Sequence, residues 1–345
     1  NNAKFTIIAP SQAISSGGPV ENVPGVSVKY TLTNIDTNEV VTGSNNGSGS
    51  VTIDVPIGTY KLECISHKDY YADSVTTFGQ INIQNIQIVY IYVSVDGNDS
   101  NFGTFFAPVK TIQKAVDKVI AMNKFTASSE EIPYKILLLS DIETSLYDSF
   151  ENNNNALVNI DPYSASSNGN PLYLTISNYG DGNATINANR TDSNTGRVMY
   201  IGENANVTLQ NLILTGGYLK NDDNTENEKG AGLYILNNDA IVKIENSVIR
   251  ENVINNGSGA GLHIGNQASK SLNLTIDKST ISSNTIYHKD TVGTYSGAGI
   301  AIENVAVTLT ITNSEINSNK INQEGITIEP QDTGVGLGLG SSAVT

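Results

Sequence analysis

One six-residue sequence recurs four times in the last third of the chain. Residues 230–235 read GAGLYI, 259–264 read GAGLHI, 297–302 read GAGIAI and 334–339 read GVGLGL. A unit that returns at such spacing is typical of a solenoid, in which each coil is one repeat that buries its apolar face against its neighbours. The recurrence therefore constrains the fold before any single residue is considered.

The residues between the hexapeptides also align, and their apolar positions form columns with one member per copy. Stacked parallel strands in register place equivalent side chains about 4.8 Å apart, so such columns predict coils that wind around one core. The four columns are Val207, Val242, Leu274 and Leu309; Leu209, Ile244, Ile276 and Ile311; Leu214, Ile249, Ile281 and Ile316; and Leu219, Ile254, Ile286 and Ile321.

Period-two alternation separates inward from outward positions within the hexapeptide. It predicts that Ala231, Leu233 and Ile235 point into the core. Gly232 and Tyr234 are then expected on the outside. The first glycine of each copy is expected to supply a positive φ for the turn into the strand.

Two polar columns run between the apolar ones. An inward asparagine at a tight corner can bond the backbone of its own turn and the asparagine of the next coil, so we predict structural ladders rather than ligand sites. The members are Asn252, Asn284 and Asn319, aligned with Gly217, and Ser247, Ser279 and Ser314, aligned with Leu212.

A single amphipathic helix is predicted before the strand-rich tract, at about residues 111–122. Its apolar residues follow helical spacing, and we expect it to cap the open first rung of the stack. The opening YVSVDGNDSNFGT (92–104), followed by PVKTIQKA (108–115), resembles right-handed parallel β-helix proteins of the pectate-lyase-like class. That resemblance implies a right-handed parallel β-helix over 92–345, and such openings precede lyases, hydrolases and non-enzymatic surface proteins alike.

The repeats themselves, clearest over 196–345, resemble those of the polymorphic outer-membrane proteins of bacterial surfaces. The shared features here are GAG followed by Leu or Ile, and the IxxN of IREN (249–252), ISSN (281–284) and INSN (316–319).

Residues 1–91 have a different pattern, with short alternating strands separated by turn residues and no helical period. This pattern indicates a β-sandwich. Residues 51–74, VTIDVPIGTYKLECISHKDYYADS, resemble transthyretin-like and carboxypeptidase-regulatory-like modules, so an immunoglobulin- or transthyretin-like sandwich is expected. The fold class predicted for the chain is all-β.

Composition excludes several classes of partner. The formal charge of −15 argues against nucleic acid or anionic membrane as a partner, because both attract basic patches. No stretch approaches the roughly 20 apolar residues of a membrane helix, so no membrane insertion is expected. The single cysteine, Cys64, excludes an internal disulfide and lies in an alternating run where a buried packing role is expected. Together these features suit a secreted or cell-surface protein.

One loop carries candidate metal ligands. Asp96, Asn98, Asp99 and Asn101 could hold calcium through their oxygens, since hard cations take several such ligands from one turn. The alternative is a solvated turn whose side chains bond their own backbone. No other cofactor is expected.

Candidate catalytic groups are sparse. An outward column of Glu245 and Asp277 is the one acidic column among the repeats, and Thr312 interrupts it. The loop bounded by Arg190 and Arg197, with Asp192 between them, is the best place for a lyase-type site.

His263 falls in the outward column with Tyr234, Ala301 and Gly338. The column offers no partner that could pair with it as base and acid. His263 is therefore predicted to be an ordinary surface residue.

Chain length varies at one corner of every predicted coil. The segments before the hexapeptides, 218–229, 253–258, 285–296 and 320–333, should lie along one edge. In solenoids such an edge is often the binding face, although surface insertions are also tolerated without any function.

These patterns favour a non-enzymatic structural or adhesion protein, with the β-helix as a stalk, an assembly unit or a loop-displaying surface. The alternative is a carbohydrate-active β-helix, either a polysaccharide lyase or hydrolase or a glycan-binding module. Expected partners are a cell-surface or host protein or a glycan. At the C-terminal edge we expect either further chain or self-association, because GVGLGL begins another coil.

Overall fold

The computed structural model describes residues 2–8, 12–14, 20–22, 25–47, 50–67, 74–83, 88–123, 132–144, 154–162, 171–220, 228–236, 240–265, 271–288, 297–303, 306–323, 335–339 and 343–344. The chain forms two compact units, Asn1–Gln87 and Ile88–Thr345. The predicted boundary between 91 and 92 therefore lies a few residues too late. The reason is β9 (Val89–Val93), which pairs in parallel with β10 (Pro133–Leu138) of the second unit.

The first unit is an antiparallel β-sandwich, as its alternation predicts. One sheet pairs β1 (Asn2–Ile8) with β6 (Ser50–Pro56), and the other has the order β5-β4-β7-β8. The strands of the second sheet are β4 (Ser27–Asn34), β5 (Val40–Ser44), β7 (Gly58–His67) and β8 (Ser74–Ile83), and a separate pair joins β2 (Gln12–Ile14) to β3 (Val20–Asn22). Alternate residues of both sheets, among them Leu32, Val55 and Tyr60, fill the core between them. Cys64 is free and buried in this core, and burial raises the pKa of its thiol.

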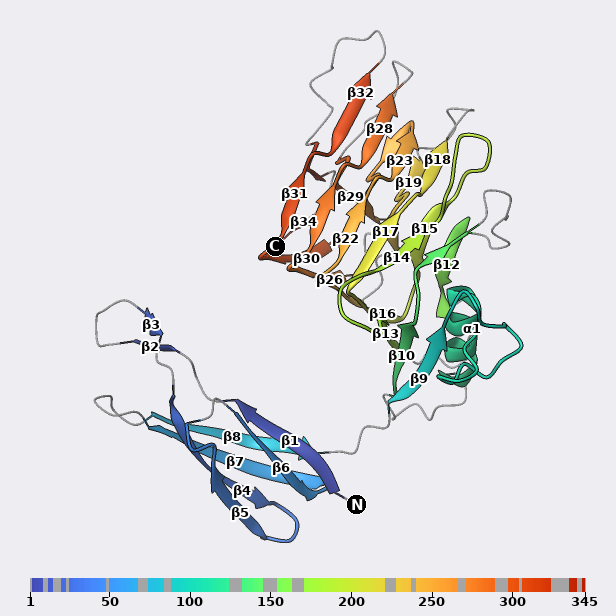
Figure 1. The fold of residues 1–345 in the computed structure, drawn as a ribbon. Helices are drawn as coiled ribbons and strands as arrows, with labels where there is room; N and C mark the ends of the chain where they lie inside the picture. The colour runs from blue at the N-terminus through green and yellow to red at the C-terminus, as the bar shows by residue number, and fades with distance from the viewer. Residues whose placement is uncertain are drawn as a thin grey trace. The chain divides into compact units, whose positions relative to one another are not determined.

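The second unit is a parallel β-helix of three sheets, whose strands form stacked rungs (Figure 1). The first sheet runs β9, β10, β13 (Leu172–Asn178), β16 (Ala205–Gln210), β21 (Ala240–Glu245), β26 (Ser271–Asp277), β30 (Ala306–Thr312) and β34 (Ala343–Val344). The second runs β11 (Ile142–Glu143), β14 (Ala184–Asn187), β17 (Leu212–Thr215), β22 (Val248–Arg250), β27 (Thr280–Ser282) and β31 (Glu315–Asn317). The third runs β12 (Ala156–Ile160), β15 (Arg197–Ile201), β20 (Leu233–Leu236), β25 (Leu262–Gly265), β29 (Ile300–Glu303) and β33 (Leu337–Leu339).

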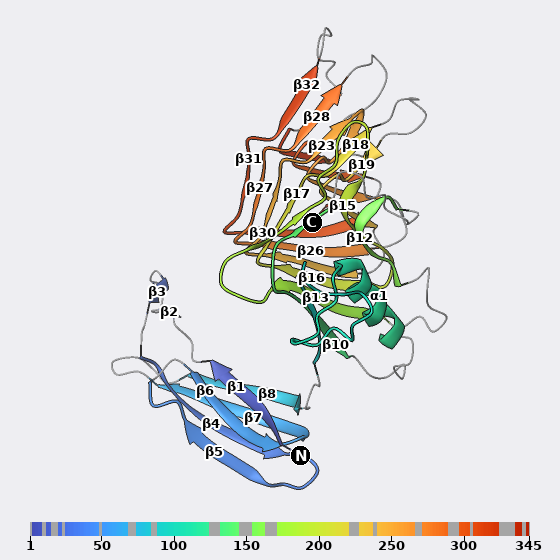
Figure 2. The same ribbon diagram turned by 45° about the vertical axis from the view of Figure 1, so that its right-hand side comes forward.

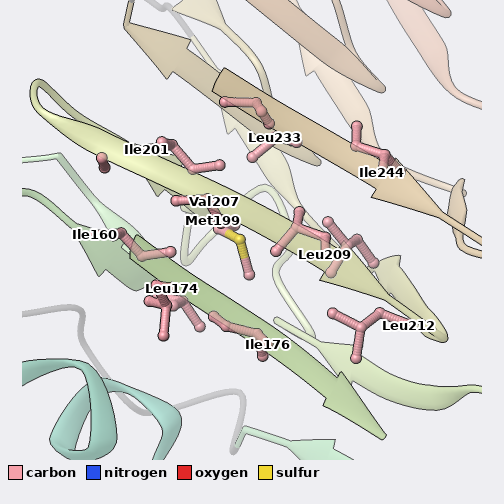
Figure 3. Packing of buried hydrophobic residues seen from close by; sticks show 14 of the residues in the cluster. Ile160, Leu174, Ile176, Met199, Ile201, Val207, Leu209, Leu212, Leu233 and Ile244 are labelled. Carbon is pink, nitrogen blue, oxygen red and sulfur yellow. The ribbon is translucent and has the colours of Figure 1, made fainter. Parts of the chain in front are cut away.

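The observed register reproduces the apolar columns predicted from the repeats. For example, Val207, Val242 and Leu274 are successive partners in the first sheet. Inward side chains of different coils interdigitate in one continuous core, where Met199 and Leu209 lie among the labelled residues of Figure 3. This core extends from Ile91 to Val307, so burial stabilises most of the coils, while Leu309 and Ile316 near the last rungs are only partly buried.

The predicted capping helix is α1 (Ile112–Asn123), and it packs against the first coil, chiefly on β12. Its buried residues include Ile112, Ala115, Val116, Val119 and Ile120, which are the predicted apolar stripe. Thr111 caps the helix, since its Oγ1 accepts a bond of 3.2 Å from the Lys114 N–H. None of the helices within the described residues is long and apolar enough to span a membrane.

A fourth parallel sheet, which we call the arm sheet, was not predicted. It consists of β18 (Tyr218–Lys220), β23 (Val253–Asn255), β28 (Thr285–His288) and β32 (Lys320–Gln323), and in Figure 2 its strands extend side by side from one edge of the β-helix. A short pair, β19 (Glu228–Lys229) with β24 (Gly257–Ser258), accompanies it. The corner segments expected to be loops therefore begin as strands, while 221–227, 289–296 and 324–334 lie outside the described residues.

The arm sheet explains the hexapeptide in a way that alternation did not. Ala231, Ala260 and Ala298 do not join the main core; with Leu219, Ile254 and Ile286 they form a second core for the arm sheet. Nor does the third residue of the hexapeptide face outward. A Cβ on Gly261 would lie 2.7 Å from the Asn284 Nδ2 and 2.6 Å from the Gly299 carbonyl oxygen, so only glycine fits there. The first glycine does have the expected positive φ, which is 66° at both Gly230 and Gly259.

Candidate functional site

A group of ionisable side chains that contact one another lies on the outer face of the third sheet. Tyr200 and Tyr234 are partners between β15 and β20, and Tyr234 is the partner of His263 on β25. The two tyrosine rings stack with centroids 5.4 Å apart, and the Tyr234 and His263 rings stack at 5.3 Å with only 3° between their planes. We call these three residues the ring column.

The ring column is covered rather than exposed. His263 has 0% of its surface exposed and Tyr200 has 8%, so the prediction of an ordinary surface histidine is wrong. The cover includes Lys229 of β19 and Glu303 of β29, whose Nζ and Oε2 atoms are 3.1 Å apart. Ser258 of β24 also hydrogen-bonds to the Glu303 carboxylate. Alternation along one strand placed His263 outward correctly but could not reveal the cover, because the cover comes from residues of other strands, namely β19, β24 and β29.

Arg197 closes one end of this group. Its Cζ lies 5.4 Å from the centre of the Tyr234 ring, within the range of a cation–π contact. Its Nη2 donates to the Lys229 carbonyl oxygen at 3.2 Å and lies 4.0 Å from the Glu228 Oε2, while its Nη1 donates to the Asn154 carbonyl oxygen. The guanidinium is thus held by backbone acceptors and one carboxylate.

Burial governs the protonation of His263. Desolvation lowers the pKa of its imidazole to about 3, and the Lys229 and Arg197 cations act in the same direction, against the Glu303 carboxylate. The His263 Nε2 lies 3.9 Å from the Glu303 Oε2, too far for a hydrogen bond, and neither ring nitrogen has a well-formed partner among the described residues. The imidazole is therefore neutral at pH 7.

Glu303 keeps its charge in the same group. Burial alone would raise the pKa of its carboxyl, but the Lys229 cation and the hydrogen bonds from Lys229 and Ser258 act to lower it, while the neutral His263 ring adds no charge. The result is an ionised Glu303 paired with Lys229 beside a neutral His263. Because the Tyr234 ring stacks on the imidazole and His263 has no exposed surface, a substrate cannot touch the His263 ring nitrogens in this arrangement.

The predicted asparagine ladder occupies a buried corner where each coil leaves the second sheet. The Asn252 Nδ2 donates to the Asn284 Oδ1 at 3.0 Å, and the Asn284 Nδ2 donates to the Asn319 Oδ1 at 3.0 Å. The same Oδ1 atoms accept the backbone N–H of the preceding member, and Gly217 N donates to the Asn252 Oδ1. We call Asn252, Asn284 and Asn319 the amide column.

The serine column links the coils at the corner between the first and second sheets. Ser247 Oγ accepts from Leu212 N, Ser279 Oγ from Ser247 N and Ser314 Oγ from Ser279 N, at 3.0 to 3.1 Å. Each hydroxyl also donates to a backbone carbonyl two residues earlier. These side chains act as connectors between coils.

The candidate calcium residues bond the chain around them. Asp99 Oδ1 accepts from the Lys110 and Thr111 N–H groups, and its Oδ2 accepts from Thr111 Oγ1. Asn98 Oδ1 accepts from Ser100, and Asn101 Nδ2 donates to the Pro108 carbonyl oxygen at 2.8 Å. Asp96 has a backbone bond to Ser94 Oγ. Among the described residues no three His, Cys, Asp or Glu side chains gather as a metal site.

The acidic column does not extend into a catalytic pair. Glu245 and Asp277 are partners in the first sheet, as predicted. Asp277 Oδ1 accepts from Thr312 Oγ1 at 2.7 Å and from Asn313 Nδ2 at 3.1 Å, and these two bonds lower the pKa of its carboxyl.

The charged residues of the predicted lyase-type loop do not gather in one site, because each contacts a different partner. Arg190 is buried and donates to Thr144 Oγ1, and Arg197 belongs to the group around the ring column. Asp192 binds Lys220 Nζ at 3.1 Å and the Tyr218 hydroxyl. The two arginines and the aspartate therefore have separate roles.

Sequence reasoning missed one exposed feature, a cluster of aromatic rings around the turn at residues 104–107. Phe106 is 95% exposed and Phe102 is 88% exposed. The signal was present in NFGTFF (101–106), where three phenylalanines fall in a turn-rich stretch without helical or strand periodicity.

Comparisons with known proteins leave the family open. No protein-family model matches the sequence, and no curated protein matches it. One similar solved structure is a rhamnogalacturonan lyase, with 15% sequence identity over 74% of this chain and a TM-score of 0.32. The match covers 62% of that enzyme's chain, which is less than two thirds of its length. A likeness this weak does not assign an activity.

Proposed function

We propose that this chain is a non-enzymatic protein of the cell surface or the extracellular space. In this proposal the β-helix is a stiff scaffold, and the arm sheet presents one edge for binding to another protein or a glycan. The observation that carries the proposal is the arm sheet itself. It is formed in register by successive coils and is supported by a core of its own.

The arm sheet suits display because its strands pair in register and adjoin, along the sequence, the most variable part of the repeats. In neighbouring strands of the arm sheet, Leu219 is the partner of Ile254, and Ile254 is the partner of Ile286. Each of these three side chains is at most 1% exposed. The sequence segments that differ in length between repeats follow directly after β18, β28 and β32. A rigid base with variable attachments is the usual design of solenoid binding surfaces.

The group around the ring column supports a structural role rather than catalysis. Its charges are neutralised within the group, by the Lys229–Glu303 contact and by Arg197 with Glu228. Catalysis of lyase or hydrolase type needs a base or acid that reaches the substrate. His263, the best candidate by type, is fully buried.

A polysaccharide panel tests the non-enzymatic part. The purified chain is incubated with pectic, alginate and glycosaminoglycan polymers, with and without calcium, while unsaturated uronides and new reducing ends are measured. We expect no turnover. Sustained product formation that disappears in E303Q or E245Q would show an enzyme and overturn the proposal.

A comparison of two single substitutions tests whether the arm sheet is the binding edge. Tyr287 on the arm sheet and Ile241 on the first sheet are similarly exposed, at 42% and 46%. Adhesion of the full chain to immobilised cells and extracellular matrix is compared for Y287S and I241S. We expect Y287S alone to weaken adhesion; equal effects, or loss only in I241S, would contradict display by the arm sheet.

A further inference from the structure

The exposed aromatic cluster is an apolar feature outside the cores that is built from several segments of the chain. Tyr92 comes from β9, Phe105 and Phe106 from the turn at 104–107, and Tyr179 from the residue after β13. Phe106 is 95% exposed, Tyr179 is 53% and Phe105 is 42%. We call these four residues the aromatic platform.

The rings of the platform contact one another. Phe105 lies 5.5 Å from Tyr92, 5.4 Å from Tyr179 and 5.3 Å from Phe106, measured between centroids. Tyr92 and Tyr179 are 5.9 Å apart. The arrangement is edge-to-face or tilted throughout, which is the favoured geometry for aromatic pairs. Ring faces on the outer side, above all that of Phe106, are left uncovered.

The backbone holds the platform in place. The Ala107 N–H donates to the Thr104 carbonyl at 3.1 Å and closes the turn that carries both phenylalanines. The Tyr92 N–H donates to the Gly103 carbonyl at 2.8 Å, and the Tyr179 N–H donates to the Leu138 carbonyl at 2.9 Å. The platform is therefore built into the first coils. Because an apolar ring left in water forgoes the stabilisation that burial gives, a fixed and exposed set of rings indicates a binding feature rather than a packing one.

The size of the platform favours a small amphipathic ligand over a protein partner. With about 200 Å² per ring, the exposed parts of the platform amount to roughly 400 Å², about half of the 800 Å² that a standard protein interface buries on each partner. The platform is flanked in the chain by polar turns, DGNDSN (96–101) and GDGN (180–183). Apolar faces beside hydroxyl and amide groups match a pyranose ring, which has C–H faces and hydroxyl edges.

We propose that the aromatic platform is a binding site for neutral, hexopyranose-containing glycans, with sugar rings stacked on Phe106 and Tyr179. The chain's formal charge of −15 favours a neutral glycan over a polyanionic one. This site lies on β9, β13 and the 104–107 turn, apart from the strands of the arm sheet, so it stands or fails independently of display by the arm.

Affinity electrophoresis of the full chain tests the site. The native gels contain cellulose-derived, mannan, starch or β-glucan polymers, and polygalacturonate serves as the anionic comparison. We expect retardation by at least one neutral polymer and less by polygalacturonate. The double variant F106S/Y179S should weaken that retardation about ten-fold, because it removes both rings on which the sugars stack.

Two controls make the outcome decisive. Val40, 56% exposed in the first unit, is changed to serine and should leave retardation unchanged. Thermal unfolding of F106S/Y179S should match that of the original chain, which excludes a folding defect. Absence of retardation in every neutral polymer, or equal retardation of F106S/Y179S and the original chain, overturns the proposal. A change in oligomeric state on F106S/Y179S would instead identify a protein interface and also overturn it.

Discussion

The amide column and the ring column are both one-residue-per-coil stacks in the same β-helix, yet they satisfy their polar groups differently. In the amide column each interior side chain accepts and donates along the stack, as Asn284 does with Asn252 and Asn319. In the ring column the contacts between members are between ring faces, and both nitrogens of His263 lack a well-formed hydrogen bond among the described residues. Identical residues can bond one another repeatedly, whereas unlike rings only stack.

The two columns are stabilised by different parts of the chain. The amide column is supported by neighbouring coils of the same repeat, so its energy is local to the stack. The ring column depends on Lys229, Ser258 and Glu303, which come from other strands and neutralise charge around a buried neutral imidazole. Loss of hydrogen bonds in the amide column should therefore lower the stability of the fold. The contribution of the ring column to stability should instead depend on pH and on the surrounding charges.

The largest effect is expected from breaking the amide column. Asn284→Ala removes the acceptor of the Asn252 N–H and Nδ2 and the donor to the Ile249 carbonyl, which leaves buried groups unpaired. We expect the free energy of unfolding to fall by about 3–5 kcal/mol. Denaturant unfolding of the second unit measures it. Asn317→Ala, which removes an exposed asparagine on the next coil, is the matched control and should change stability by less than about 0.5 kcal/mol.

The second largest loss of stability is expected when a side chain is added to the glycine that packs against the amide column. Gly261→Ala places a Cβ 2.7 Å from the Asn284 Nδ2 and 2.6 Å from the Gly299 carbonyl, so the coil must shift. The expected loss is about 2–4 kcal/mol. Gly180→Ala, where a Cβ would meet nothing within 4 Å, is the comparison. Equal stabilities of G261A and G180A would show that the coils are not tightly registered.

The third effect is a loss of folding stability at acidic pH, caused by the buried imidazole of the ring column. The unfolded chain binds a proton on His263 near pH 6.5, whereas the folded chain does so only near pH 3, so stability is lost as the pH falls through this window. Between pH 7 and pH 5 the loss should be about 2 kcal/mol. His263→Phe keeps a stacked ring and should remove that loss. His67→Phe, which removes an exposed histidine, should retain it, and an unchanged pH dependence in H263F would contradict a buried neutral imidazole.

The smallest effect is expected from the cover of the ring column. Lys229→Met removes the cation that lies 3.1 Å from the Glu303 Oε2 and should cost about 1 kcal/mol at pH 7, because both side chains are only partly buried. Thermal unfolding at pH 7 measures it. Lys278→Met, whose partner Asp277 is at the surface, should show no measurable change. A larger effect for K278M would mean that surface charge, not the cover, dominates.

Parts of this picture follow from the sequence because they depend on local pattern. Alternation identified the strands, helical spacing identified α1 to within one residue at each end, and alignment of the repeats identified the partners of Val207 and Ile249. Asn284 could be placed in a ladder because the same residue returns at the same position of successive repeats.

Other parts could not follow, because they depend on contacts between segments with no shared pattern. His263 has the outward parity of a surface residue, yet it is fully buried, and Tyr234 of β20 and Glu303 of β29 lie against it. Arg190 and Arg197 are close in sequence but face different partners. The aromatic platform joins residues from three separate segments, and its rings meet only through the fold.

The coil thus follows from sequence pattern, because a repeated hexapeptide and repeated columns can be satisfied together only by stacking equivalent residues. Three features depend instead on the folded arrangement: which outward residues are covered, why the third position of the hexapeptide is glycine, and where charged groups meet. Periodicity along one strand reports only which side a residue faces. Burial and charge pairing depend on what another part of the chain places on that side.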